Sequence, residues 1–179
     1  MKTKISSEKG FTLIETIGAV FVMTIGVIGS YYIVQYSISS NNYARAKLTA
    51  SSLAQEGIEI VRNIRDSNWL EMRYGLDTQW NDDLGVGEYE GDYQIDTEEN
   101  PQTLMVCVNP CSYAGNLRFL RSNAGFYNYS EGEDTIFKRK ISIVQSTDSF
   151  IEVVVGVFWE SSGEKMNYVS VQEILYNWH

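Results

Sequence analysis

The sequence predicts an α+β fold in which a long N-terminal helix, half of it transmembrane, packs on a C-terminal antiparallel β-sheet. Three observations support this fold class. An apolar run occupies residues 17–34, and small and apolar residues then continue at helical spacing to about residue 66. Further along, apolar and polar residues alternate with a period of two within residues 135–179. A period near 3.6 indicates a helix, and a period of two indicates strands.

The first half of the predicted helix is long and apolar enough to cross a membrane. Residues 16–44 contain no Asp, Glu, Lys, Arg or His. As a helix, residues 11–34 would be about 36 Å long, at ~1.5 Å per residue, and a bilayer core is ~30 Å thick. Lys2, Lys4 and Lys9 precede the run. Because positive flanks stay in the cytoplasm, we expect a single pass through the cytoplasmic membrane, N-terminus in and C-terminus out.

An ordinary cleaved signal peptide is the simpler alternative, and two features count against it. Glu15 lies at the leading edge of the apolar segment, where a carboxylate costs roughly 2–4 kcal/mol on insertion scales. The helical pattern also continues beyond the apolar run as one stripe of small and apolar residues. Its members are Ala46, Ala50, Leu53, Ala54, Gly57, Val61 and Ile64. We therefore expect an amphipathic second half of the same helix over residues 37–66.

The remaining chain divides into a variable, loop-rich region at residues 67–134 and an antiparallel sheet at residues 135–179. The loop-rich region holds two weak strand candidates, at residues 93–97 and 103–108. The C-terminal part predicts a three-stranded meander with turns near residues 146–149 and 161–165. One face of this sheet would lie on the helical stripe, where Ala50, Ala54 and Gly57 permit close approach.

The residues around the start of the apolar run form a specific motif. A basic residue, Lys9, is followed by Gly10, Phe11, Thr12, two aliphatic residues and Glu15. This segment resembles the processing site of type IV prepilins and of type II secretion pseudopilins. The resemblance implies a pilin fold and a leader peptide at residues 1–10. It also implies cleavage between Gly10 and Phe11 by a prepilin peptidase, N-methylation of Phe11, and a transmembrane and filament-core helix at residues 11–36.

Glu15 would be the fifth residue of the mature chain. Cleavage after Gly10 creates a cationic amine at Phe11, beside or inside the bilayer, and a buried charge requires a partner. We expect Glu15 to form an assembly salt bridge with the Phe11 amine of an adjacent subunit.

Most members of this family carry a proline near the middle of the N-terminal helix, whereas this chain has Gly18, Gly26 and Gly29 instead. Glycine weakens a helix by up to about 1 kcal/mol. Any local melting on assembly would therefore centre on residues 26–30. Alternatively, these glycines only permit close helix packing.

The resemblance implies a non-catalytic structural subunit of a type IV pilus, most like a minor pilin. A minor pseudopilin of a type II secretion system is the alternative, and a major pilin or a membrane-tethered ligand-binding ectodomain is less favoured. Implied partners are other pilins or pseudopilins in a helical filament, the prepilin peptidase, an inner-membrane platform protein and an assembly ATPase. The subunit would occupy the membrane before assembly, and afterwards a cell-surface or periplasmic filament.

Composition argues against catalysis and against nucleic-acid binding. The chain has two cysteines and one histidine, His179, too few for a tetrahedral zinc site. It has no phosphate-binding loop, so assembly energy must come from a separate ATPase. From Arg45 onward there are 11 basic and 21 acidic residues, a net charge of −10 that repels polyphosphate. We expect no enzyme activity, no resident metal and no direct nucleic-acid partner.

Two local features have alternative interpretations. Cys107 and Cys111 could form a disulfide, which export would permit, or remain free thiols. Between Asp77 and Glu99, nine carboxylates occur without a Lys or Arg. Calcium binding there is conceivable, because Ca²⁺ takes six to eight oxygens, but a solvated acidic loop is the favoured interpretation.

Overall fold

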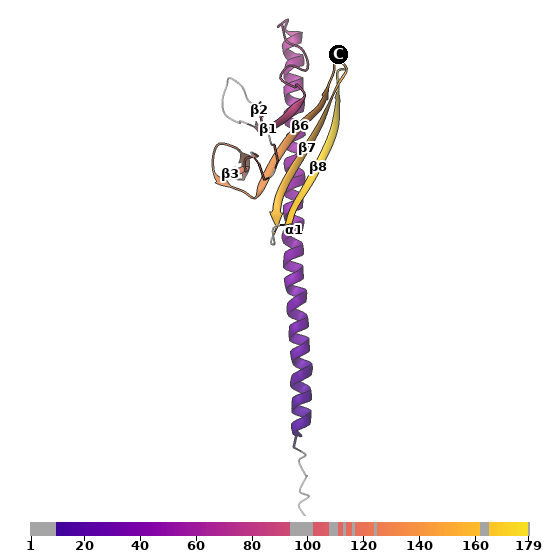
Figure 1. Cartoon of the computed structure of the whole chain (residues 1–179), viewed down its shortest axis with the longest axis vertical. Coiled ribbons are helices and arrows are strands. Elements are labelled where there is room, and N and C mark those ends of the chain that lie inside the picture. Colours follow the sequence, from indigo (N-terminus) through magenta and orange to yellow (C-terminus); the bar gives the residue numbers. More distant parts are fainter. Residues whose placement is uncertain are drawn as a thin grey trace, which may run out of the picture. The chain divides into compact units, whose positions relative to one another are not determined.

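A computed structural model describes residues 10–93, 102–107, 111–112, 114–115, 117–123, 125–161 and 165–178 (Figure 1). It contains one helix, α1 (Leu13–Arg73), and two sheets within these residues. The strands are β1 (Gly87–Tyr93), β2 (Gln102–Val106), β3 (Arg121–Asn123), β4 (Phe126–Asn128), β5 (Glu133–Asp134), β6 (Phe137–Ser146), β7 (Phe150–Ser161) and β8 (Lys165–Tyr176). By its contacts the chain divides into two compact units, residues 1–43 and 44–179.

Helix α1 continues to Arg73, so the predicted end near residue 66 was wrong. Asn68, two residues beyond the predicted end, is buried, and its Nδ2 donates to the backbone oxygens of Trp80 at 3.3 Å and Asp82 at 2.8 Å. The helix ends two residues before Gly75, whose φ of 81° only glycine adopts readily. Gly75 N donates to Met72 O and Leu76 N to Glu71 O, the bonds of a Schellman motif.

The larger sheet is antiparallel and has the strand order β2-β1-β6-β7-β8. The predicted meander is present as β6, β7 and β8, which confirms a helix packed on an antiparallel sheet (Figure 1). The sheet is larger than this meander, because β1 and β2 extend it from the region expected to be loop-rich, and β2 overlaps the second weak strand candidate at residues 103–108. Strand β1 ends at Tyr93, where the first weak candidate was placed, and residues 94–97 of that candidate lie outside the described residues.

The core of the second unit lies between the small-residue stripe of α1 and the inner face of the larger sheet. Ala50, Leu53, Ala54 and Val61 are buried and belong to one cluster with apolar residues of the sheet. The sheet contributes Phe137, Ile141, Ile143, Ile151, Val153, Val155, Val157, Trp159 and Leu175. These residues alternate along each strand, as expected for a sheet with one covered face. The predicted face of the helix is therefore the face that packs on the sheet.

Gly57 marks the closest approach of helix and sheet. A Cβ atom at this position would lie 2.7 Å from Cγ1 of Val155 and 3.3 Å from Cδ of Arg139. Real carbon contacts are essentially never as short as the first of these distances. The absence of a side chain at residue 57 is thus a requirement of this interface, as the sequence predicted.

A charged side chain crosses the same interface. Arg139 on β6 is fully buried, and its Nη1 donates to Leu53 O at 3.2 Å and to Glu56 Oε1 at 2.9 Å. Glu56 is about one-third exposed. A buried guanidinium is costly without a partner, so this pair fixes which part of α1 faces β6.

The region between β2 and β6 carries a second, three-stranded sheet with the order β4-β3-β5. Backbone bonds join its flanks to the larger sheet. Leu120 N donates to Phe137 O at 2.8 Å, and Thr135 N donates to Leu120 O at 2.8 Å. The part of this region that the structure describes is therefore an ordered extension of the main sheet.

We predict that Gly57→Ala destabilises the folded domain by about 1–3 kcal/mol, because the added methyl overpacks the contact with Val155. The measurement is chemical unfolding of the full chain in detergent micelles, followed by tryptophan fluorescence. Gly85→Ala is the matched control, since its Cβ would meet only the Tyr89 hydroxyl at 3.7 Å. Equal stability of the two variants would contradict the close contact.

Candidate functional site

The segment of the predicted cleavage site precedes the first turn of α1. Residues 10–12 are not helical, and α1 begins at Leu13. Phe11 is 83% exposed. The peptide bond between Gly10 and Phe11 therefore lies in accessible, non-helical backbone, the form in which a protease can bind a substrate segment. The leader residues before Gly10 lie outside the described residues.

Thr12 caps the helix. Its carbonyl accepts from Glu15 N and Thr16 N, each at 3.1 Å, and its Oγ1 accepts from Glu15 N at 3.4 Å. Thr12 and Glu15 thus occupy the first and fourth positions of a capping-box sequence. This explains why the helix starts after the cleavage site instead of running through it.

Glu15 lies in the first turn of α1 and is exposed. A carboxylate in the first turn interacts favourably with the positive end of the helix dipole. Phe11 precedes it by four residues, so Gly10, Phe11 and Glu15 all lie within one short segment. Processing between Gly10 and Phe11 and a salt bridge of Glu15 stay predictions.

The helix that follows presents an uncovered apolar surface. It is the one helix among the described residues that is long and apolar enough to cross a membrane, and none of its apolar window is buried. Large apolar side chains are exposed throughout; they include Ile17, Phe21, Met23, Ile25, Val27, Ile28, Tyr31, Tyr32 and Ile33. Apolar surface of this extent is the mark of a membrane or protein interaction site.

The glycine-containing stretch of this helix is regular. Residues 26–30 are helical, and Ser30 Oγ donates to Gly26 O at 2.8 Å. Such a side-chain bond satisfies a helix carbonyl locally. Melting of this stretch on assembly stays a prediction, because it concerns a filament and not the single chain.

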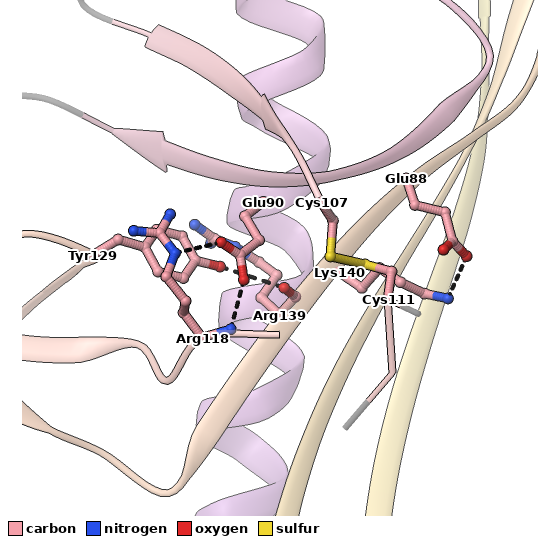
Figure 2. Close-up of a disulfide and its surroundings, with 8 residues drawn as sticks. All are labelled: Glu88, Glu90, Cys107, Cys111, Arg118, Tyr129, Arg139 and Lys140. Atoms are coloured by element: carbon pink, nitrogen blue, oxygen red, sulfur yellow. Dashed lines mark hydrogen bonds and ion pairs between the residues drawn. A yellow bond between two sulfur atoms is a disulfide. The ribbon is translucent and has the colours of Figure 1, made fainter. Parts of the chain in front are cut away.

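Cys107 and Cys111 form a disulfide, with their Cα atoms 5.8 Å apart (Figure 2). Cys107 N donates to Glu88 O at 2.9 Å, which extends the pairing of β2 with β1. Cys111 is buried. Beside the disulfide, Lys140 Nζ lies 2.7 Å from Glu88 Oε1. The disulfide therefore closes a short loop directly at the edge of the main sheet.

A second polar cluster near the disulfide was not predicted from the sequence (Figure 2). The Glu90 carboxylate on β1 is buried and accepts from Arg118 N and Arg118 Nε, each at 2.6 Å. The Arg118 guanidinium lies 4.7 Å from the centre of the Tyr129 ring, and Tyr129 Oη donates to Arg139 O at 3.3 Å. No local pattern could identify this cluster, because its members come from separate segments.

The acidic stretch between Asp77 and Glu99 is only partly described. Asp77, Asp82 and Asp83 are exposed, and Asp82 Oδ2 accepts from Gln79 N at 2.7 Å. Within the described parts of the chain, no group of three or more possible metal ligands comes together. Asp96, Glu98 and Glu99 lie outside those parts, so calcium binding stays a prediction.

Comparison with known families gives one match, to the prokaryotic N-terminal methylation motif, over residues 5–31. No curated protein and no solved structure matches the chain significantly. The matched residues include Gly10, Phe11 and Glu15 and most of the apolar helix. They make up a small part of the chain, and residues 32–179 are outside the match.

We predict that Tyr129 titrates far above ordinary tyrosines, because burial raises the pKa of its hydroxyl to about 12. The folded state retains this proton between pH 10 and 12, whereas the unfolded chain loses it, so Tyr129 lowers stability as the pH rises through this range. Ultraviolet difference titration should find that Tyr129→Phe removes a late-titrating phenol. Tyr168→Phe, at an exposed tyrosine, is the control and should leave the late-titrating phenol in place. Loss of an early phenol in Tyr129→Phe would contradict the prediction.

Proposed function

We propose that this chain is a structural subunit of a type IV pilus. The premise is that its N-terminal methylation motif is the motif of the type IV prepilin and pseudopilin family. The observation that carries the proposal is the motif joined to an exposed apolar helix. Such a helix needs lipid around it before assembly and neighbouring helices afterwards. Members of this family are generally structural and non-catalytic, and we assign this chain no enzyme activity.

Processing begins at the accessible segment before α1. A prepilin peptidase cuts between Gly10 and Phe11 and then methylates the new amine of Phe11. The helix cap at Thr12 keeps the cleavage site out of regular helix, which supports this step. The mature chain then begins one residue before its own helix cap.

Glu15 acts when the subunit leaves the membrane. The Phe11 amine and the Glu15 carboxylate are both costly in an apolar environment when each is alone. In a filament, the Glu15 carboxylate of one subunit neutralises the Phe11 amine of its neighbour. This pairing favours insertion at the correct depth, because any other depth leaves both charges unpaired.

We assign the subunit to the minor pilins, on the irregular and aromatic-rich character of residues 67–134. It is made in the cytoplasmic membrane with its C-terminal domain outside, and an assembly ATPase and a platform protein transfer it into the filament. The same motif serves type II secretion pseudopilins, which are the second candidate. Deletion of the gene distinguishes them, because a pilus subunit affects motility, adhesion or DNA uptake, whereas a pseudopilin affects protein secretion.

We predict that the mature protein begins with an N-methylated Phe11. Intact-mass and N-terminal peptide mass spectrometry of membrane and sheared-filament fractions measure this directly. Gly10→Val is the control and should retain the leader, because a side chain at the cleavage site obstructs a tight protease pocket. A mature chain that starts at Met1, or downstream of residue 34, would overturn the proposal.

We also predict that Glu15→Ala is processed normally but enters filaments at a level at least about tenfold lower, because the buried amine of its neighbour loses its partner. Immunoblots of sheared filaments and of membranes give the ratio. Glu160→Gln, which neutralises an exposed carboxylate on β7, is the matched control and should assemble normally. Normal assembly of Glu15→Ala would remove this role from Glu15.

A further inference from the structure

In the described part of the chain after the disulfide, Arg118 contacts the β1–β2 hairpin. Arg118 donates from both its backbone N and its Nε to the Glu90 carboxylate on β1. Its Nη2 also lies 3.7 Å from the sulfur of Met105 on β2. Glu90 and Met105 are directly opposite each other in the register of the two strands. Arg118 therefore contacts both strands of the hairpin at one register position, and Figure 2 shows its contact with Glu90.

The contact between Arg118 and Glu90 is a charge-assisted one. Glu90 is only 5% exposed when the segment is docked. If the segment containing Arg118 leaves, the Glu90 carboxylate loses its cation and both of these hydrogen bonds together. The described backbone next to Arg118 is also attached to the main sheet, since Leu120 N donates a hydrogen bond to Phe137 O on β6. Leu120 O accepts a second hydrogen bond from Thr135 N, just before β6.

The disulfide limits where this segment can go. Cys107 directly follows β2, and its backbone N donates a hydrogen bond to Glu88 O on β1. Glu88 lies two residues before Glu90 on β1. The disulfide holds Cys111 beside Cys107, and Cys111 is buried. The chain that leads to Arg118 therefore starts at the hairpin. Without the disulfide, Cys111 stays joined to Cys107 only by the backbone of the three residues between them, which enlarges the volume that this chain explores and makes docking of Arg118 less probable.

We propose that the redox state of Cys107 and Cys111 controls whether the segment around Arg118 docks on the β1–β2 hairpin. On oxidation the two thiols lose two protons and two electrons and form the sulfur–sulfur bond. A protein or small-molecule disulfide accepts the electrons and is reduced to two thiols. In a reducing compartment the segment is undocked, and it docks when the chain meets an oxidising one. The inference does not rest on the proposed filament function.

Hydrogen exchange of the full chain in detergent micelles, with and without dithiothreitol, tests the inference. Reduction should speed exchange of the Arg118 and Leu120 amides about tenfold or more, because their bonds to Glu90 and Phe137 open more often. Strand β7, in the middle of the main sheet, should keep its exchange rates. The double variant Cys107→Ser/Cys111→Ser should match the reduced protein without reductant.

Two glutamates of β1 provide a matched pair of variants. Glu90→Gln weakens the contact with Arg118 and should speed exchange at Arg118 even in the oxidised protein. Glu88→Gln removes the ion pair with Lys140 on the other side of the disulfide and should leave the exchange rate of the Arg118 amide unchanged.

Three results would overturn the inference. The first is unchanged exchange at Arg118 and Leu120 after reduction. The second is equal acceleration in β7, which would make the disulfide a general stabiliser. The third is an oxidised Glu90→Gln protein with normal exchange at Arg118, which would exclude the carboxylate as the docking contact.

Discussion

The rest of this molecule depends on the need to cover the apolar first half of α1. Its backbone groups are satisfied within the helix, but its side chains are exposed over the whole apolar window. Water cannot accommodate such a surface, so the chain needs lipid or other apolar helices around it. Glu15 makes sense only in this setting, because a carboxylate at the edge of an apolar helix is a cost unless a specific cation meets it.

The second half of α1 meets a different requirement, since it must bury one face and leave the other free. Ala50, Ala54 and Gly57 bring the helix backbone close to β7, and Gly57 leaves room for Val155. Arg139 then fixes the position of the helix along the sheet by pairing with Glu56 and with the carbonyl of Leu53. Close packing sets the distance between helix and sheet, and the buried charge sets the register.

The middle region is held by buried apolar residues such as Leu84 and Leu120, which join the main core, and by a cluster of polar contacts. Glu90, Arg118 and Tyr129 connect β1, the segment after the disulfide and the end of β4, and Tyr129 continues to β6. Each buried polar group in this cluster is bonded to another member or to a nearby backbone group. Such clusters specify one arrangement because partial satisfaction is expensive. The disulfide between Cys107 and Cys111, which closes a short loop, then anchors the segment that leads from the β1–β2 hairpin to Arg118.

The sequence by itself determined the features that depend on local pattern. The N-terminal motif is one contiguous segment. The stripe around Gly57 and the three strands β6, β7 and β8 follow the period of their own element, and the apolar helix is a continuous run, so neighbouring residues carry the signal. Only the tertiary structure decided the features that depend on distant partners. Helix α1 continues beyond Asn68, whose side-chain amide donates to the backbone oxygens of Trp80 and Asp82. Strand β1 pairs with β6 although its sequence shows no strong alternation of apolar and polar residues. Glu90 finds Arg118 across 28 residues of chain, a pairing that a single sequence does not encode in any local spacing.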